Sequence, residues 1–172
     1  MLYTRTGDTG TTRLFGCDGR ISKTAPRIEA LGNLDELNSW IGLCAANMAK
    51  DDAIARYLRA FQEDLFVLQA HVAGASKAIA ADRVRFLEEV VASVEREIEP
   101  LRSFTIPGAV ASSGMLDVAR TVARRTERSV IAIQDESLAT VIPYLNRLSS
   151  ALFALARIAA HRAHVKEQSP RY

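Results

Sequence analysis

The chain has 172 residues, of which 48% are apolar and 24% charged, and its formal net charge is +2. This length fits one domain over residues 1–172, which can bury a core without a disulfide or a metal, and the composition excludes a disordered protein. The near-neutral charge excludes binding to nucleic acid or to a membrane surface through bulk charge, so any functional positive charge must be local.

We expect a cytoplasmic protein. The first residues, MLYTRTGDTG, are polar and hold no apolar stretch of the kind found in a secretory signal. The longest uncharged run, Ser103 to Leu116, is interrupted by Pro107 and two glycines and is too short for a membrane span. Cys17 and Cys44 show no disulfide framework and no metal-binding spacing, and as reduced thiols they favour a reducing compartment.

Residues 1–26 are rich in Gly, Thr and Arg and have no helical period, so TRTGDTGTTRLFG predicts a glycine-punctuated loop or a loose hairpin. From Arg27 onward apolar residues recur every three or four positions, which predicts amphipathic helices. The expected helices cover about residues 27–49, 54–72, 84–98, 113–134 and 144–165.

Helix ends are read from capping residues and prolines. The side chains expected to cap helices are Asp51 or Asp52 for the second, Asp82 for the third, and Ser137 or Thr140 for the fifth. Pro100 ends the third helix, and Pro143 is tolerated only in the first turn of the fifth. Long periodic segments with short connections predict an all-α fold, a five-helix up-and-down bundle over residues 27–167.

The N-terminal loop, Thr4 to Arg13 with Lys23 beyond it, combines glycines, hydroxyl groups and cations. Glycines let a backbone approach a ligand closely, and successive N–H groups can hold the oxygens of a polyphosphate. The spacing of a Walker A loop is missing. Composition alone also fits a solvated N-terminal tail.

The predicted fourth helix concentrates arginines. At about 100° per residue, three guanidinium groups and one carboxylate share a face, formed by Arg120, Arg124, Arg128 and Glu127. The apolar positions Val118 and Val122 are expected on the opposite face. Arginine forks suit phosphate oxygens, and the carboxylate can hold its neighbours' rotamers, so the pattern favours anion binding. The alternative is a solvated helix face with ordinary i,i+4 ion pairs.

Polar residues also interrupt two apolar helix faces. Asp35 and Asn38 do so in the first helix, and the segment from Tyr144 to Ser150 does so in the fifth. Unpaired buried polar groups are costly, so these residues must pair within the bundle or across a subunit interface. Spacing alone fits structural pairing as well as catalysis.

The histidines give no support to a metal centre. His71, His161 and His164 are the chain's three histidines, and none completes the Glu-x-x-His spacing of a di-iron bundle. No motif for a serine or cysteine nucleophile appears either. We therefore expect no metal site built from a protein motif.

Six stretches in order resemble the family of PduO-type ATP:cob(I)alamin adenosyltransferases along nearly the whole chain. They are TRTGDTGTT, Lys23 with RIEALGNLDELNSWIG, FQEDLFVLQA, FTIPG, VARTVARRTER and YLNRLSSALFALAR. The resemblance implies an enzyme that transfers the adenosyl group of ATP to reduced cobalamin. It also implies a homotrimer of five-helix bundles with active sites between subunits.

The resemblance assigns roles to particular residues. The implied ATP-binding residues are Thr4, Arg5, Thr6, Gly7, Asp8, Gly10, Thr12, Lys23, Arg124, Arg125, Glu127, Arg128 and Asn146. Asp35 and Arg120 match a pair that bridges subunits beside the site, and with Arg124 they are the implied catalytic residues. Phe104 matches the aromatic residue that packs beneath the corrin and excludes its lower axial base. The chain departs from the family at three positions, where Ala109, Asp117 and Ser150 replace the usual Gly, His and Asp.

The implied mechanism needs no protein nucleophile, because the cobalt(I) ion attacks the ribose 5′ carbon of ATP and tripolyphosphate leaves. Lys23 and the arginines, with Mg²⁺ carried by ATP, would neutralise charge on the leaving group. The implied partners are ATP, cob(I)alamin or cob(II)alamin, a reductase and a cobalamin-dependent acceptor enzyme. Two alternatives are a non-catalytic trimer that binds ATP and delivers cobalamin, and a structural bundle without ATP affinity.

Overall fold

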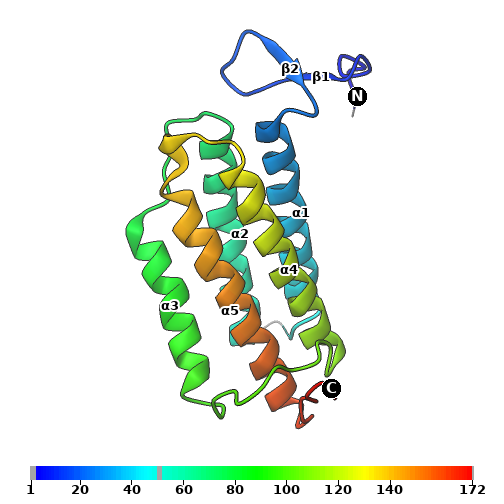
Figure 1. Cartoon of the computed structure of the whole chain (residues 1–172), viewed down its shortest axis with the longest axis vertical. Coiled ribbons are helices and arrows are strands. Elements are labelled where there is room, and N and C mark those ends of the chain that lie inside the picture. The colour runs from blue at the N-terminus through cyan, green and yellow to red at the C-terminus, as the bar shows by residue number, and fades with distance from the viewer. Residues whose placement is uncertain (1–2, 50–51, 172) are drawn as a thin grey trace.

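The computed structural model describes residues 3–49 and 52–171. Within these residues the chain forms five α-helices that run alternately up and down, which confirms the predicted fold (Figure 1). They are α1 (Pro26–Ala46), α2 (Ala53–Val72), α3 (Ala81–Glu95), α4 (Ala111–Ile131) and α5 (Val141–Arg162). A short 3-10 helix, η1 (Glu136–Leu138), precedes α5.

The core lies where α5 packs against α3 and α4, and where α1 packs against α2 and α4. All five helices contribute buried apolar side chains, and Tyr144, Phe61 and Leu34 are among the largest that are fully buried. The apolar period of the sequence thus becomes a continuous core, which explains why the helix pattern was readable from the sequence.

A buried carboxylate joins three of the helices. Asp64 on α2 accepts bonds from Arg83 on α3, with Nε at 2.8 Å and Nη2 at 2.9 Å, and from the Tyr144 hydroxyl on α5 at 2.7 Å. Burial, with the adjacent Asp64 charge, raises the pKa of Tyr144 above its ordinary value, so this phenol stays protonated and donates. The network is structural and fixes the start of α5.

Helix starts follow the predicted caps only in part. Asp52 caps α2 by accepting a 2.8 Å bond from the Ile54 N–H, whereas the alternative, Asp51, lies outside the described residues. The prediction for α3 is wrong, because Ala80 occupies the cap position and Asp82 lies in the first turn. A carboxylate there still interacts favourably with the helix dipole.

The remaining boundaries differ by about one turn. Thr140 precedes α5 without a side-chain capping bond, Ser137 lies in η1, and Pro143 lies in the first turn of α5 as predicted. The helices α1, α3, α4 and α5 end about one turn earlier than the periodicity suggests. After α4 and α5 the chain turns at Gln134 and His164, each with φ of 55°, a left-handed conformation that cannot continue a helix.

The N-terminal segment forms a small hairpin at one end of the bundle (Figure 1). Strand β1 (Thr11–Arg13) pairs antiparallel with β2 (Arg20–Ser22), with Thr11 opposite Ser22. Arg20 donates from Nε to the Thr11 hydroxyl at 2.8 Å and also bonds the carbonyl of Thr6. The sequence predicted a glycine-punctuated loop or a loose hairpin for the N-terminal segment, and the hairpin is the structure observed.

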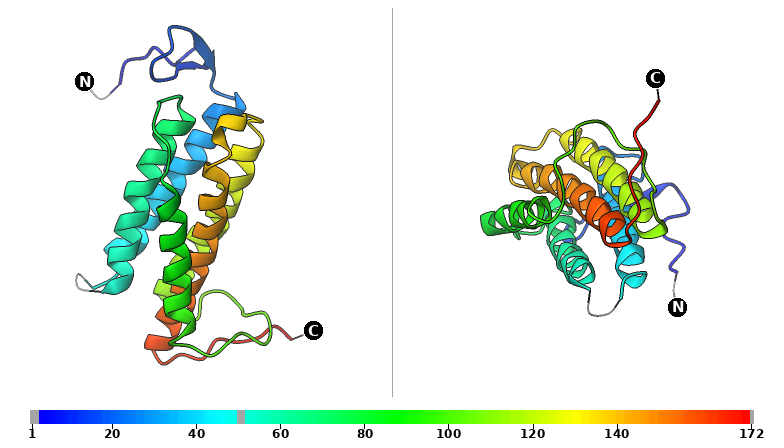
Figure 2. Two further views of the ribbon diagram at one scale, coloured as in Figure 1. Left: turned by 90° about the vertical axis from the view of Figure 1, so that its left-hand side faces the viewer. Right: turned by 90° about the horizontal axis from the view of Figure 1, so that it is seen from below.

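The opposite end of the bundle is closed by the long connection from α3 to α4 and by the C-terminal segment (Figure 2). The two run beside each other, with the Ile106 N–H donating to the Gln168 carbonyl at 2.7 Å. A second bond, of 2.8 Å, joins the hydroxyls of Ser103 and Ser169. This contact between the chain's last residues and a loop that precedes α4 was not anticipated from the sequence.

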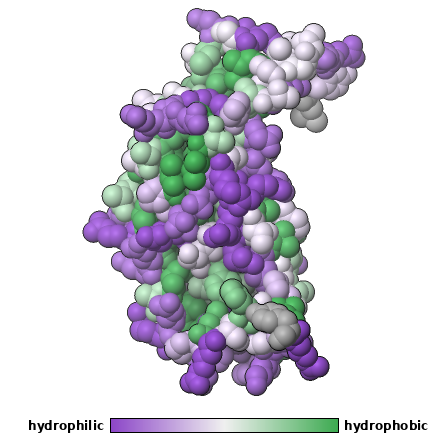
Figure 3. All heavy atoms as spheres, in the orientation of Figure 1, coloured by the Kyte–Doolittle hydropathy of each residue, from purple (hydrophilic) through white to green (hydrophobic). Residues whose placement is uncertain are grey.

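On the face shown in Figure 3, hydrophilic side chains and small apolar patches alternate over the helices, as they do on the surfaces of folded proteins in general. Among the described residues, no helix combines the length and the apolar character that crossing a membrane requires.

Candidate active site

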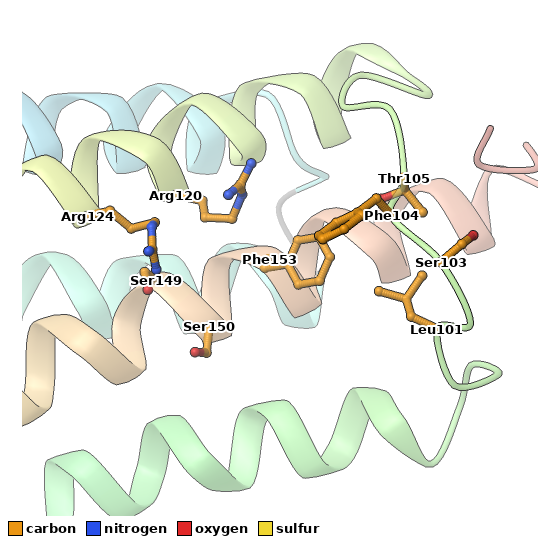
Figure 4. Close-up of a pocket in the computed structure, with 9 residues that line it drawn as sticks. All are labelled: Leu101, Ser103, Phe104, Thr105, Arg120, Arg124, Ser149, Ser150 and Phe153. Carbon is orange, nitrogen blue, oxygen red and sulfur yellow. The ribbon is translucent and has the colours of Figure 1, made fainter. Parts of the chain in front are cut away.

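A pocket of about 570 Å³ opens between the α3–α4 connection, α4 and α5 (Figure 4). Its walls come from three separate parts of the chain: Leu101, Ser103, Phe104, Thr105, Arg120, Arg124, Ser149, Ser150 and Phe153. Figure 4 shows Phe104 and Phe153 at one end of this pocket and Arg124 with Ser149 at the other. The pocket thus joins an aromatic end to a cationic end.

Phe104 is the most exposed residue of the aromatic end, with 78% of its surface accessible. A phenylalanine held in a loop and left this exposed gains little from the protein core, so it offers an apolar face to a ligand. The Phe104 ring therefore does not pack into the core of the described chain.

Two partners hold Arg120 in place. Its Nε donates to Asp117 Oδ1 at 3.4 Å, and its guanidinium lies 5.6 Å from the centre of the Phe153 ring. Arg124, one turn further along α4, is exposed and makes no hydrogen bond or ion pair to any described residue. The Arg124 guanidinium is therefore available to an anion that enters the pocket.

The other polar residues of α4 divide between two neighbouring helices. Glu127 faces α5, where it accepts a 3.1 Å bond from the Asn146 amide, while Arg125 turns toward α1 and pairs with Glu36. Arg128 is exposed. The structure therefore places Arg120, Arg124 and Glu127 on the side of α4 that meets α5. The predicted apolar face is wrong at Val118, which is 39% exposed.

The N-terminal loop has a compact geometry of its own. Gly10 adopts φ of +76°, and its carbonyl accepts a 2.9 Å bond from the Lys23 N–H. The Lys23 ammonium lies against Gly7, where an added Cβ would be 2.8 Å from Nζ. The loop thus presents the Lys23 ammonium beside the Gly7 backbone, where no side chain intervenes. The hydroxyls of Thr4 and Thr6, which lie 2.9 Å apart, belong to the same loop.

The loop and the pocket do not meet within one chain. The hairpin lies at the end of the bundle opposite the Phe104 connection (Figures 1 and 2). In the part of the chain that the structure describes, hydrogen bonds of residues 3–25 stay within that segment or reach the first turn of α1. Asp8 and Thr12 belong to this same segment, so the predicted ATP residues fall into two separate groups.

The polar residues of α1 have unequal surroundings. Asp35 is exposed, while Asn38 is buried and its Oδ1 has no hydrogen-bond partner among the described residues. Within the chain, the carboxylate beside Arg120 is Asp117. Asp35 and Arg120 therefore do not pair among the described residues, and their pairing across a subunit interface stays a prediction.

Sequence reasoning did not single out Phe153 as a site residue. Ser149 lies in the polar segment expected to interrupt the apolar face of the fifth helix, and Asp117 is one of the chain's departures from the family. The i,i+3 spacing of Asp117 and Arg120 could have indicated their pairing. Of the other departures, Ser150 lines the pocket and Ala109 lies in the connection just before α4.

No group of three or more His, Cys, Asp or Glu side chains that could hold a metal ion is present in residues 3–49 and 52–171.

The fold and the pocket together define a helical-bundle protein whose pocket joins a cationic wall to an apolar one. The chain belongs to the cobalamin adenosyltransferase family, whose model matches residues 2–159.

Named relatives agree with this assignment. The chain is 41% identical over 184 residues to the corrinoid adenosyltransferase PduO of Salmonella typhimurium, covering 99% of this chain and 54% of the relative. It is 42% identical over 170 residues to a corrinoid adenosyltransferase of Citrobacter freundii, covering 91% and 93%. The chain thus spans about half the length of the Salmonella protein and nearly all of the second relative.

Solved structures share the fold. A variant of a PduO-type ATP:corrinoid adenosyltransferase from Lactobacillus reuteri, complexed with cobalamin and ATP, superimposes with a TM-score of 0.93 at 28% identity over the full length of both chains. Another variant of that enzyme, complexed with ATP, gives a TM-score of 0.91 at 29% identity, covering 99% of this chain and 100% of the other.

Proposed function

We propose that this protein transfers the 5′-deoxyadenosyl group of ATP to cob(I)alamin. In this reaction a cobalt–carbon bond forms at the ribose 5′ carbon while the bond from that carbon to the triphosphate oxygen breaks. The cobalt supplies the electron pair, and tripolyphosphate leaves with the pair of the broken bond. The products are adenosylcobalamin and tripolyphosphate.

The observation that carries this proposal is the pocket with its aromatic and cationic ends. Phe104 and Phe153 offer the apolar surface that a corrin ring needs, and Arg120 and Arg124 lie on the adjoining wall. Charge builds on the triphosphate as it leaves, and fixed guanidinium groups beside it stabilise that charge in the transition state. Positioning the two substrates supplies the rest of the catalysis, because the nucleophile belongs to cobalamin.

We place the N-terminal loop of one subunit over the pocket of the next, in a homotrimer. The support is that the loop lies at the end of the bundle opposite the Phe104 connection, although the loop and the pocket both have the character of phosphate sites. In this arrangement, the loop residues Thr4 to Thr12 and Lys23 bind the triphosphate together with α4 of the neighbour. Asp35 of one subunit then pairs with Arg120 of the other, beside the site.

The triphosphate would carry Mg²⁺, which would add positive charge to this site. The chain's own residues bind the nucleotide: Asn146 and Glu127 fix the surface of α4 and α5, with Arg124 and Arg128 exposed beside it and Arg125 on the side of α4 that meets α1. We further propose a cytoplasmic protein that receives cobalt reduced by a separate reductase and passes its product to a cobalamin-dependent enzyme. Cys17 and Cys44, both free thiols, fit such a reducing compartment.

The test is an assay with purified protein, ATP, Mg²⁺ and chemically reduced cobalamin. We expect adenosylcobalamin, followed by its absorption spectrum, and one tripolyphosphate for each ATP consumed. Tight ATP binding without product would favour the non-catalytic delivery trimer. A protein that binds no ATP would be a structural bundle, and both outcomes contradict the proposal.

A further inference from the structure

The loop that carries Phe104 is fastened to the molecule on two sides. On one side it bonds to the C-terminal segment, through the Ile106 N–H and the Gln168 carbonyl. On the other side the Gly108 N–H donates a 3.2 Å bond to Oδ2 of Asp117, on the second turn of α4. The second attachment connects the loop, through Asp117, to Arg120 in the wall of the pocket.

Asp117 is bonded at once to the connection that carries Phe104 and to Arg120, which lines the pocket. While Oδ2 accepts from Gly108 in the Phe104 loop, Oδ1 accepts from the Nε of Arg120. The Asp117 side chain is only 12% exposed, so its charge needs both donors. A carboxylate accepts several bonds together, so this one side chain serves both donors.

Glycines bring the loop close enough for this bond. Gly108 has φ of +88°, a left-handed conformation that favours glycine. An added Cβ at Gly114, in the first turn of α4, would lie 3.4 Å from the Gly108 Cα. The Ser113 hydroxyl accepts a 3.0 Å bond from the Val110 N–H and fixes the entry into the helix. The loop backbone therefore lies directly against α4, within reach of Asp117.

We propose that Asp117 is a positioning residue that fixes the spacing between the Phe104 loop and Arg120. It keeps the Phe104 ring, which would face the corrin, at a fixed distance from the Arg120 guanidinium, which would face the triphosphate. This inference rests on the proposed function, because the spacing affects turnover only when both substrates occupy the pocket. Asp117 acts through Gly108 and Arg120 and need not touch a substrate itself.

Two variants separate the two bonds. Asp117→Asn keeps an oxygen for the Gly108 N–H but removes the charge that attracts Arg120, while Asp117→Ala removes both. In both variants we expect kcat to fall. The KM for cob(I)alamin should rise by about tenfold or more only in Asp117→Ala, because only there is the Phe104 loop released. An unchanged KM for cob(I)alamin in Asp117→Ala, or an equal rise in both variants, would overturn the proposal.

A second measurement needs no turnover. Amide hydrogen exchange of the peptide covering residues 104–110 should be faster than wild type in Asp117→Ala and close to wild type in Asp117→Asn. Glu63→Ala, which removes an exposed carboxylate from α2, is the matched control and should leave that peptide unchanged. Wild-type exchange of residues 104–110 in Asp117→Ala would overturn the role of Asp117, whatever the activity. An inactive wild-type enzyme would refute the proposed function while leaving this exchange test intact.

Discussion

The side-chain amide of Asn146 on α5 donates a 3.1 Å hydrogen bond to Glu127 on α4. Asn146 also accepts a 2.7 Å bond from Arg147, so its amide is held on both sides. The bond holds Glu127 against α5, and Glu127 forms no ion pair with an arginine among the described residues. Arg124 is then left to a ligand, which is the basis of the first prediction.

Arg124→Ala should lower kcat by on the order of 10²-fold or more, because its guanidinium meets charge that develops on the leaving triphosphate. The matched control is Arg59→Ala, which removes an exposed arginine from α2. Steady-state kinetics with saturating ATP and cob(I)alamin make the comparison. If Arg124 belonged to an ordinary solvated face, both variants would stay within a few-fold of wild type and lose at most about 1 kcal/mol of stability.

Gly7→Ala tests the N-terminal loop. The added methyl group would lie 2.8 Å from the Lys23 Nζ and must push the flexible lysine aside, which the fold tolerates. We expect the KM for ATP to rise by about tenfold, with stability changed by less than about 0.5 kcal/mol. Gly19→Ala is the control, since no heavy atom lies within 4 Å of its added Cβ. Equal KM values for ATP in the two variants would contradict the proposed role of Lys23 in ATP binding.

Subunit complementation tests the shared site. Lys23→Ala and Arg124→Ala protein should each be nearly inactive alone. After the two are unfolded together and refolded, activity should reappear, because some sites then combine a wild-type loop with a wild-type α4. Light scattering should report a trimer throughout. A monodisperse, active monomer would contradict the assembly, and a mixture that stays inactive would place loop and helix in the same subunit.

Periodicity predicted α1 to α5 because the apolar spacing follows directly from the helix repeat and is satisfied by one shared core. It could not predict contacts between distant segments. The bond between Ile106 and Gln168 joins two loops with no period at all, and the bond from Gly108 to Asp117 depends on a left-handed glycine. Val118 was misplaced because the buried face of α4 follows its neighbours α1 and α5, which the sequence of one helix does not specify.

Tyr144→Phe should reduce stability by about 1–2 kcal/mol. The substitution removes the bond to Asp64, whose carboxylate keeps its two-pronged contact with Arg83, so the loss is limited to one buried bond. Tyr57→Phe is the control, because the Tyr57 hydroxyl makes no hydrogen bond to a described residue. Urea denaturation measures both. A loss no larger in Tyr144→Phe than in Tyr57→Phe would show that the network contributes little.

Phe104→Ala separates the chemistry of cobalt from the binding of ATP. The ring is 78% exposed, so its removal sacrifices little buried surface and should cost less than about 1 kcal/mol of stability. The variant should bind ATP normally and should still adenosylate cob(I)alamin supplied directly, because cobalt(I) has no axial base to displace. Starting from cob(II)alamin with a mild reductant it should fail, since five-coordinate cobalt(II) is harder to reduce.

Phe66→Ala, which truncates a 65% exposed phenylalanine on α2, should match wild type in every assay. The decisive measurement is the absorption or EPR spectrum of cob(II)alamin with ATP present: the four-coordinate signal should appear in wild type and in Phe66→Ala, and its survival in Phe104→Ala would rule out this role.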